Sequence, residues 1–507
     1  MMYDLSQAPQ LMAALVPDLA LMAGAMGLAL FAAWRPVSDA HQRAVGRAAL
    51  AVLVVVIGLV VRAAVSGGMA SEGVIAVDGF RWAVDLVILL AALGTVAMGI
   101  EQHPREGVRH AEAHVLVLLA ASGMMILAAA RDLMVIFLGI EIMSVAVYAL
   151  AGLNRRSARS AEASLKYFLL GAFATGFLLY GIALVYGATG ETQLGAISDA
   201  IVGHSLGLDP MLLVGVGLLV IGFAFKVAAV PFHMWAPDVY DGAPAPVAAF
   251  MAAAVKAAAF ATFLRVCYEG LYLVGMWREP VLWIALVTMV VGNLVALSQT
   301  NIKRLLAYSG IVHSGYLLVG AVAATALAST AFTFYMVGYT LATIGAFALI
   351  GALQPAGETD APITAYEGLW TTRPWLAVGM SVYLLAFLGF PVFGGLGFLG
   401  KWYLLTAAIA SPARLVVVAV VIVLTSVVSA GYYLPVIRAM FMKPRPDGAV
   451  EPEVTGPLTR AVLVTSVVLI LVCGLMPSAV VGVASRSGFA PHPISAEFAS
   501  PWAGVAP

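Results

Sequence analysis

The sequence has little charge, and this shortage excludes soluble classes of protein. Only 10% of its 507 residues are charged, whereas 62% are hydrophobic and the mean hydropathy is +1.01. A water-facing surface needs roughly a quarter of the chain to be charged, so most of this surface must face lipid. The sequence therefore predicts an all-α polytopic membrane protein.

Further absences exclude several cofactors and partners. Cys267 and Cys473 lie far apart in apolar runs, so we expect no cysteine-ligated iron–sulfur or zinc site and no disulfide framework. Neither a strand-borne GxGxxG nor a GxxxxGK[ST] loop occurs, so the sequence has no signature of nucleotide binding. The 26 basic and 26 acidic residues cancel, so the net charge gives no support to a nucleic-acid partner. We therefore expect no metal and no cofactor on this chain, and any chemistry must use side chains embedded in the membrane.

Long apolar runs predict about fourteen transmembrane helices. The first run is too long for a signal-peptide core, so we expect it to remain as a span. The predicted spans lie near residues 11–33, 45–66, 82–100, 113–130, 133–151, 162–187, 211–230, 246–268, 279–298, 302–322, 327–353, 374–409, 414–441 and 460–484.

Basic residues predict the orientation of these helices. They favour the connections after odd-numbered spans by about two to one. Because cytoplasmic loops carry the excess of lysine and arginine, we expect both termini outside the cytoplasm and the polar loop from Lys443 to Arg460 inside it.

The seventh and twelfth spans carry helix-breaking residues, which are Pro231 in the seventh and Pro391, Gly394 and Gly395 in the twelfth. Backbone carbonyls freed inside a membrane must bind protein or water, so a broken helix usually lines a cavity. The two breaks lie five helices apart, and an odd offset inverts the second block, which indicates inverted repeats. The predicted units are helices one to three (1–112), two repeats (113–268 and 279–441), and a last helix with its tail (460–507).

Lys256 is the most informative residue of the sequence. It lies about ten residues from either end of the eighth predicted span, roughly 15 Å deep, where its side chain cannot reach water at either surface. Lysine at this depth costs roughly 2.5–3.5 kcal/mol, which favours a functional role over a structural bond to a backbone carbonyl.

Three more charged residues accompany it. Lys226 immediately precedes the first break and Lys401 follows the second, and each could instead hold the carbonyls of its broken helix. Glu141 lies inside the fifth span, so it is either neutral or paired with one of these lysines. A row dominated by lysines repels metal cations and suits proton transfer through bound water.

Weaker candidates lie nearby. His233 could bridge water between Lys226 and Lys256 or cap the freed carbonyls, and His313 is typical of a polar packing contact. Lys166 lies about one turn inside the sixth span, where a relay and an extension toward the surface are equally compatible with its position.

These motifs resemble a known family. The runs FLGIEIMSVAVYAL, FKVAAVPFHMWAPDVYDGAPAPVAAFMAAAVKAAAF and GFPVFGGLGFLGKWYLL are similar to the antiporter-like subunit N of bacterial NADH:quinone oxidoreductase, respiratory complex I. The similarity covers nearly the whole chain. The sister subunit M typically has glutamate at the position of Lys401, and the sister subunit L continues into a long lateral helix, so the resemblance favours N.

The resemblance implies a function and a role for each candidate. It implies proton translocation coupled to quinone reduction elsewhere in the complex, with Glu141 and Lys226 as a charge pair, Lys256 as the central relay and Lys401 as the second proton site. Lys166, His233, Lys303 and His313 are the expected auxiliary residues. NADH, FMN, iron–sulfur clusters and quinone are expected on other subunits. Subunits M and K and lipids are the expected partners, in the bacterial inner membrane with periplasmic termini.

Other functions remain open from the sequence. The D-type subunit of multi-subunit sodium/proton antiporters shares the fold and the buried lysines. A stand-alone secondary transporter, or a scaffold whose buried charges only hold helices together, is also compatible with the pattern.

Overall fold

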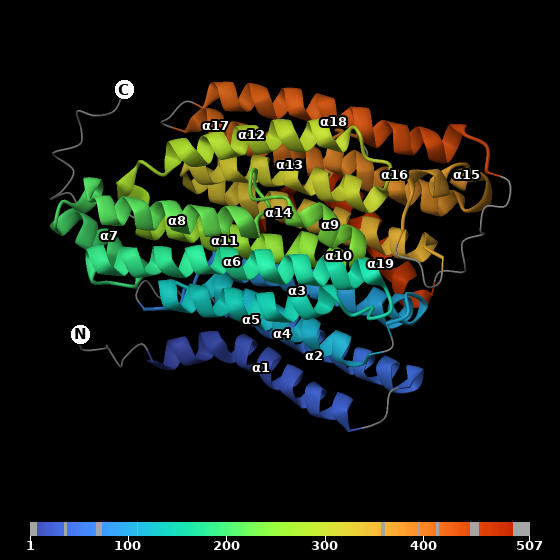
Figure 1. Cartoon of the computed structure of the whole chain (residues 1–507), viewed down its shortest axis with the longest axis horizontal. Helices are drawn as coiled ribbons and strands as arrows, with labels where there is room; N and C mark the ends of the chain where they lie inside the picture. Colours follow the sequence, from blue (N-terminus) through green and yellow to red (C-terminus); the bar gives the residue numbers. More distant parts are fainter. Residues whose placement is uncertain are drawn as a thin grey trace.

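The computed structural model describes residues 8–34, 38–66, 73–108, 110–355, 360–392, 395–411, 415–446 and 456–489. Helices dominate this part of the chain, and its only β-type pairings are isolated bridges. Most of the long helices lie side by side along the long axis of the molecule (Figure 1). This arrangement confirms the all-α membrane fold that the composition predicts.

Twelve helical segments of the described residues are long and apolar enough to cross a membrane. The eleven regular ones are α1 (Ala8–Ala33), α2 (Asp39–Ser66), α3 (Gly79–Arg105), α4 (Glu112–Ala129), α5 (Leu133–Ala151), α6 (Ala158–Thr189), α12 (Arg278–Ala296), α13 (Ile302–Ala323), α14 (Ala326–Leu353), α18 (Val416–Met442) and α19 (Pro457–Leu475). The twelfth is a continuous segment made of α10 (Ala245–Phe250), η3 (Met251–Val255), α11 (Lys256–Arg265) and η4 (Val266–Gly270).

Two further crossings are broken in the middle. One consists of α8 (Pro210–Lys226) and α9 (Trp235–Gly242), and the other of α16 (Pro374–Leu388) and α17 (Gly395–Ala410). Pro231 lies in the first gap and Pro391 in the second, whereas Gly394 lies outside the described residues. With these two crossings the number of spans reaches fourteen, as the sequence predicts.

The last predicted span differs from the structure. The sequence indicates one helix over 460–484, but α19 ends at Leu475 and a separate helix, α20 (Ser478–Arg486), follows it. Pro477 separates the two, because proline has no N–H to donate and disfavours helical geometry in the residue before it. The remaining short elements are α7 (Leu194–Gly203), η2 (Leu206–Leu208), η5 (Tyr272–Val274), η6 (Ile363–Tyr366) and α15 (Leu369–Thr372).

Short polar side chains fix where several spans begin. The Asp132 carboxylate accepts hydrogen bonds from the first N–H groups of α5, and the Asn301 side chain does the same for α13. Asp78 caps α3 and also binds Arg265 at 2.9 Å. Burial raises the pKa of Asp78, but Arg265, the N–H of Arg81 and the charge of Arg131 together hold the pKa below its usual value. These caps set the register of helices that carry the polar residues of the interior.

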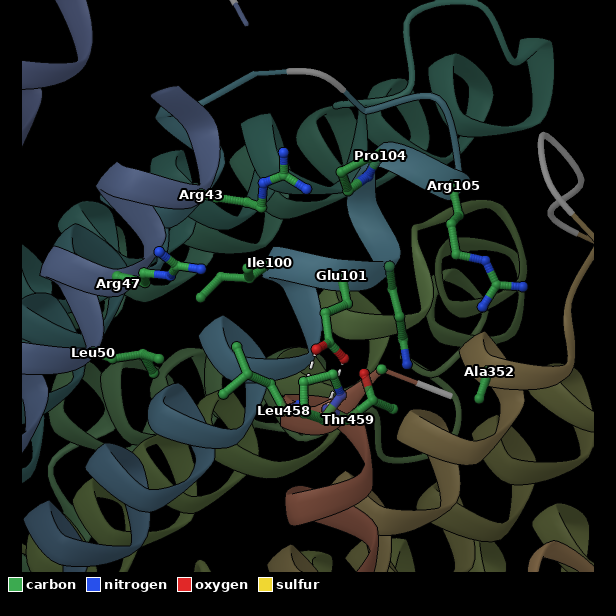
Figure 2. A pocket seen from close by; sticks show the side chains of 13 residues that line it. Arg43, Arg47, Leu50, Ile100, Glu101, Pro104, Arg105, Ala352, Leu458 and Thr459 are labelled. Carbon is green, nitrogen blue, oxygen red and sulfur yellow. Dashed lines mark hydrogen bonds between the residues drawn. The ribbon is translucent and has the colours of Figure 1, made fainter. Parts of the chain in front are cut away.

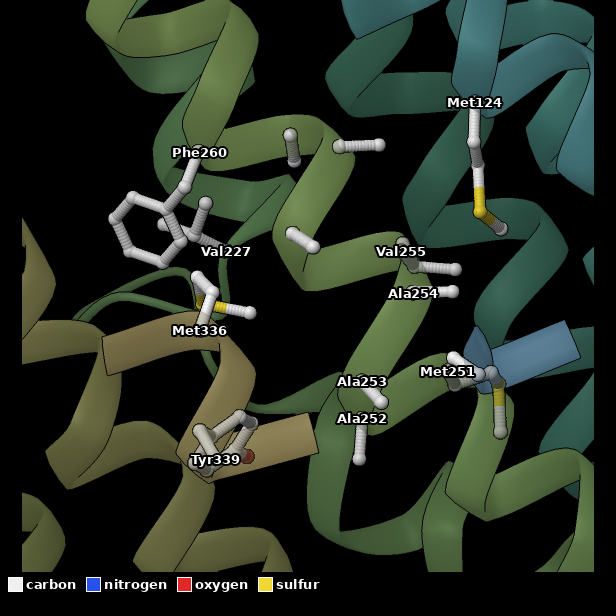
Figure 3. Close-up of a cluster of buried hydrophobic side chains, with 14 of the residues drawn as sticks. Met124, Val227, Met251, Ala252, Ala253, Ala254, Val255, Phe260, Met336 and Tyr339 are labelled. Atoms are coloured by element: carbon white, nitrogen blue, oxygen red, sulfur yellow. The ribbon is translucent and has the colours of Figure 1, made fainter. Parts of the chain in front are cut away.

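The middle of the molecule is built around the segment Ala245–Gly270, which is buried along its whole apolar stretch. Figure 3 shows the small side chains of Ala252 and Ala253, with Met336 and Tyr339 of α14 on one side and Met124 of α4 on the other. Small residues let neighbouring helices approach closely in a membrane. Lys256 directly follows this run, so it lies in the centre of the packed bundle.

Candidate functional site

Lys226 ends α8 and points into the interior. Its side chain is only 4% exposed, and its Nζ donates to Ser144 Oγ at 2.7 Å and to Tyr148 OH at 3.3 Å. Ser144 and Tyr148 lie one turn apart on α5, so both hydroxyls face the same side of that helix. The buried ammonium is thus held by groups that can both accept and donate a proton.

The carbonyls freed at the first break have other partners. The indole N–H of Trp235 donates to Phe225 O at 3.0 Å, and Ser314 Oγ of α13 donates to Val227 O at 2.6 Å. On the donor side, the N–H of Val230 binds Thr288 Oγ1 of α12. These three contacts satisfy the backbone without using the ammonium of Lys226.

Glu141 does not contact Lys226. It lies on α5 one turn before Ser144, and within the described residues it forms no ion pair with any lysine. It lies close enough to Lys226 to interact with it electrostatically. Lys226 contacts hydroxyls of α5 instead, and Glu141 precedes Ser144 by about 4.5 Å along the helix axis. The functional charge pair that the resemblance implies stays a prediction.

Lys256 lies between two segments with π-helical geometry, η3 and η4. Its side chain is 4% exposed, and its Nζ donates to Gly310 O of α13 and to Tyr339 OH of α14, the latter at 3.4 Å. Ser314 Oγ also donates to Gly310 O, at 3.1 Å. Because Ser314 binds Val227 O as well, it connects the break beside Lys226 with the carbonyl that holds Lys256.

His313 lies between the central and the second lysine. Its Nδ1 shares a hydrogen bond with Tyr335 OH, and its ring lies 5.0 Å from the ring of Tyr339 and 5.7 Å from that of Tyr316. His313 also borders a cavity of about 10 Å³, which is close to the smallest volume that can hold a water molecule. The sequence favours a polar packing contact for His313, and the structure gives it one, between rings that border Lys256 and Lys401.

Lys401 has a different set of partners. Its Nζ donates to Leu388 O, the last carbonyl of α16, at 2.9 Å and to Ser426 Oγ of α18 at 3.3 Å. It also lies 4.9 Å from the centre of the Tyr316 ring, and Tyr316 OH is 3.4 Å from Ser426 Oγ. The ammonium therefore satisfies a broken-helix carbonyl and joins a hydroxyl network at the same time.

Together these contacts form a polar axis across the bundle, defined here as the lysines and the groups that link them. From Lys226 the axis passes the carbonyl of the next residue, Val227, to Ser314, and the carbonyl of Gly310 then joins Ser314 to Lys256. Beyond Lys256 it includes Tyr339, the ring contacts of His313 with Tyr339 and Tyr316, and then Ser426 and Lys401. Its members come from α8, α13, α11, α14, α18 and α17.

Two of the auxiliary residues, Lys166 and Lys303, lie near the end of the bundle where α13 begins. Lys166 binds Asp238 at 2.7 Å, and the second carboxylate oxygen of Asp238 binds Arg304 at the same distance. Asp238 thus bridges α6 and α13. Lys166 is 41% exposed, in keeping with its position near the surface.

Lys303 is fully buried and donates to the carbonyls of Asp241 and Ala243. Glu106 lies close enough to interact with Lys303 electrostatically, and its carboxylate accepts from the N–H of Ala245. Burial raises the pKa of Glu106 to about 7, although Lys303 opposes the rise. A carboxyl group that titrates near neutrality therefore lies at the end of α3.

His233 lies in the first gap and is partly exposed. In the described part of the chain it forms no hydrogen bond with Lys226 or Lys256. A bridge through water between the two lysines stays a prediction.

The sequence analysis missed the hydroxyl and phenol groups of the axis. Ser144, Ser314, Tyr339 and Ser426 are ordinary residues of apolar helices, and no motif distinguishes them from packing residues. A usable signal exists for Ser144 and Tyr148, which lie three and seven residues after Glu141 on one helical face. The described residues contain no group of three potential metal ligands.

Comparisons with known proteins identify the family of this chain. A family model described as the NADH:quinone oxidoreductase/Mrp antiporter transmembrane family matches residues 130–429. The NADH-quinone oxidoreductase subunit N of Gemmatimonas aurantiaca is 49% identical over 504 residues, covering 97% of this chain and 96% of the relative. Subunit N of Trichlorobacter lovleyi is 44% identical over 82% of this chain and 84% of the relative.

Solved structures match over the same extent. A chain of respiratory complex I from Thermus thermophilus with bound aureothin has a TM-score of 0.78 at 36% identity, covering 94% of this chain and all of that chain. A chain of the Mrp complex from Dietzia shares the fold, with a TM-score of 0.78 at 21% identity over 94% of this chain and 97% of that chain. The chain belongs to the NADH:quinone oxidoreductase/Mrp antiporter membrane family, in the group of the NADH-quinone oxidoreductase subunits N.

Proposed function

We propose that this chain translocates protons in the membrane arm of an NADH:quinone oxidoreductase and that the polar axis is its proton path. One observation carries the proposal: three lysines, each 4–6% exposed, lie in one row across the bundle, and each contacts at least one hydroxyl or phenol group. Buried charges of this kind are costly and usually mark an ion or proton route. The subunit N relatives, named as parts of an NADH-quinone oxidoreductase, support the same assignment.

Lys256 is the central station of this proposed path. Its ammonium can pass a proton to Tyr339 OH, whose ring contacts His313. His313 is in ring contact with Tyr339 and Tyr316 but hydrogen-bonds Tyr335, so water would have to complete the step across it. From Tyr316 the route continues through Ser426 to Lys401. Hydroxyl, phenol and imidazole groups can each donate and accept a proton, which a row of purely apolar side chains could not do.

Between Lys226 and Lys256 the chain of contacts includes backbone carbonyls, which accept but do not donate. Water entering between the two lysines would therefore have to complete this step. Ser314 positions both sides of the gap, because its hydroxyl binds the carbonyl next to Lys226 and the carbonyl that holds Lys256. We assign Ser314 as a positioning residue and Glu141 as the charge that tunes Lys226 from a distance.

We also propose how the helices are organised and oriented in the membrane. Helices four to eight (113–268) and nine to thirteen (279–441) act as inverted repeats, each with one broken helix. The cluster of Lys166, Asp238 and Lys303 lies on the cytoplasmic side, and both termini lie in the periplasm of a bacterial inner membrane. Reporter fusions at Asp360 and Pro507 test this topology: a cytoplasm-specific reporter should be active at Asp360 and silent at Pro507, and the reverse pattern would invert the assignment.

We assign NADH, FMN, iron–sulfur clusters and quinone to other subunits, and subunits M and K as the neighbours in the membrane arm. The family model also covers Mrp antiporter subunits, so the D-type subunit of a multi-subunit sodium/proton antiporter is the second candidate. Purification of the native complex separates the two. Co-migration with flavin and iron–sulfur subunits supports the oxidoreductase, and an iron-free assembly supports the antiporter.

Replacement of Lys256 by Met tests the proton path itself. Methionine has a similar length but carries no proton, so we expect an assembled complex whose proton uptake per NADH oxidised falls by roughly tenfold or more. Lys256→Arg should recover little, because arginine does not release its proton at useful rates. The control is Lys443→Met, which removes an exposed lysine paired with Glu367. Parental pumping in assembled Lys256→Met would refute the relay.

A further inference from the structure

A cavity of about 530 Å³ lies at the end of the bundle where α3 ends, away from the polar axis. Its walls come from the start of α2, the end of α3 and the start of α19 (Figure 2). This volume falls within the range of about 300–1,000 Å³ that is typical of small-molecule sites.

Arginines face this cavity from two sides. Arg43 and Arg47 lie one turn apart on α2, and both are exposed. Neither forms a hydrogen bond or an ion pair within the described residues. Figure 2 shows them on one side of Glu101 and Arg105 on the other, and Arg105 also donates to Gln354 O of the α14 end.

The carboxylate that borders the cavity, Glu101, is bound to backbone N–H groups. Glu101 accepts hydrogen bonds from the N–H groups of Leu458 at 2.9 Å and Thr459 at 2.8 Å. It thereby caps α19 and offsets the partial positive charge of that helix terminus. The charge of the two α2 arginines consequently remains uncompensated by any carboxylate contact among the described residues, and the cavity favours an anion.

The position of the arginines along α2 corresponds to the depth of lipid headgroups. The helix has 28 residues and is therefore about 42 Å long, whereas the hydrocarbon core is about 30 Å thick. The first turns of α2 thus extend beyond the hydrocarbon, and Arg43 and Arg47 lie in those turns.

Exposed apolar surface lies on the helices that form the cavity, further toward the middle of the membrane. Leu90 of α3 lies three turns before Glu101 on the same side of the helix and is 45% exposed, although most of α3 is buried. The flanking helices α2 and α19 both pack against α3 and keep most of their own apolar stretches exposed. A soluble anion would leave this apolar surface uncovered, whereas the acyl chain of a lipid would cover it.

We propose that this cavity binds the headgroup phosphate of an anionic phospholipid, with Arg43 and Arg47 as its recognition residues and with one acyl chain along Leu90. Basic pockets between transmembrane helices on the cytoplasmic side are suited to such headgroups. The site is independent of the lysine pathway, since none of its residues belongs to the polar axis.

Photo-crosslinking of the purified complex in lipid nanodiscs tests the site. Photoreactive phosphatidylglycerol should label peptides of α2 and α19, and the same probe with a phosphatidylcholine headgroup should label them at least about tenfold less. Arg43→Gln with Arg47→Gln should reduce the phosphatidylglycerol labelling by roughly tenfold to thirtyfold. Arg43→Lys with Arg47→Lys retains the charge and should retain most of the labelling.

The matched control is Arg155→Gln with Arg156→Gln, which removes two exposed arginines of the α5–α6 connection. This pair should leave the labelling of α2 and α19 unchanged. Equal labelling by the two headgroups in the parental complex overturns the proposal without any variant. Loss of labelling in millimolar inorganic phosphate would overturn it as well, because it would identify a site for soluble anions.

Discussion

The two broken helices solve the same backbone problem with different side chains. At the first break, Trp235 and Ser314 bind the freed carbonyls, and Lys226 is left to bind hydroxyls of α5. At the second break, the ammonium of Lys401 itself binds the last carbonyl of α16. The backbone at the first break is thus held without Lys226, whereas Lys401 holds the backbone at the second break in addition to its proposed proton transfer.

This difference shows that burial alone does not distinguish a functional lysine from a structural one. Both side chains are almost completely buried, at 4% and 6% exposure. Their partners differ, because a carbonyl can only hold the ammonium while a hydroxyl can also pass a proton on. The two roles can therefore be separated by substitutions that keep or remove the hydrogen-bond donor.

The largest contrast is expected between Lys226→Met and Lys401→Met. Both should lower proton pumping by roughly tenfold or more, since each removes a proton carrier. Only Lys401→Met leaves a buried carbonyl without a donor, which costs about 1–3 kcal/mol of stability. Thermal inactivation of the detergent-solubilised complex, measured beside pumping, should therefore shift for Lys401→Met and stay near the parental value for Lys226→Met. Equal shifts in the two variants would contradict the comparison.

A side chain that donates a hydrogen bond but does not titrate should separate the structural role of Lys401 from its proposed role in proton transfer. Lys401→Gln retains an N–H for Leu388 O, so we expect it to recover most of the stability lost in Lys401→Met while pumping remains low. Lys401→Glu can titrate and should retain partial pumping. The readout is proton uptake per NADH oxidised in membrane vesicles, with subunit content measured in parallel. Normal pumping in Lys401→Gln would assign Lys401 to a purely structural role.

The sequence predicted the helix breaks and the central lysine of this site, but not the residues that connect them. Proline and an intramembrane lysine have strong local consequences, so Pro231, Pro391 and Lys256 mark the breaks and the centre without any structure. Ser314 has no such signature, because its role depends on α13 packing against the first break. The cavity at Arg43 has none either, since it forms only where three helices meet.

Ser314 should have a smaller effect than either lysine. Ser314→Ala removes the donor to Val227 O and Gly310 O, which we expect to cost about 1 kcal/mol of stability and to lower pumping by a few fold. Ser314→Thr keeps the hydroxyl and is the matched control. A positioning role also predicts that the Lys256→Met background hides the pumping defect of Ser314→Ala, because the step that Ser314 aligns is already lost. An additional loss of the same size in that background would show that Ser314 acts elsewhere.

The smallest effect is expected at Glu141, because it acts on Lys226 through space and not through a contact. Pumping should decrease in the order parental, Glu141→Asp, Glu141→Gln, since Asp keeps the charge at a shorter reach. Combining Glu141→Gln with Lys226→Met should lose less than the product of the two single losses, because the carboxylate has no ammonium left to tune. The coupling should stay at about 1 kcal/mol or less, below that of a buried ion pair in contact. Fully multiplicative losses would mean that Glu141 serves the proton path independently of Lys226, and a much larger coupling would mean that the two side chains meet during turnover.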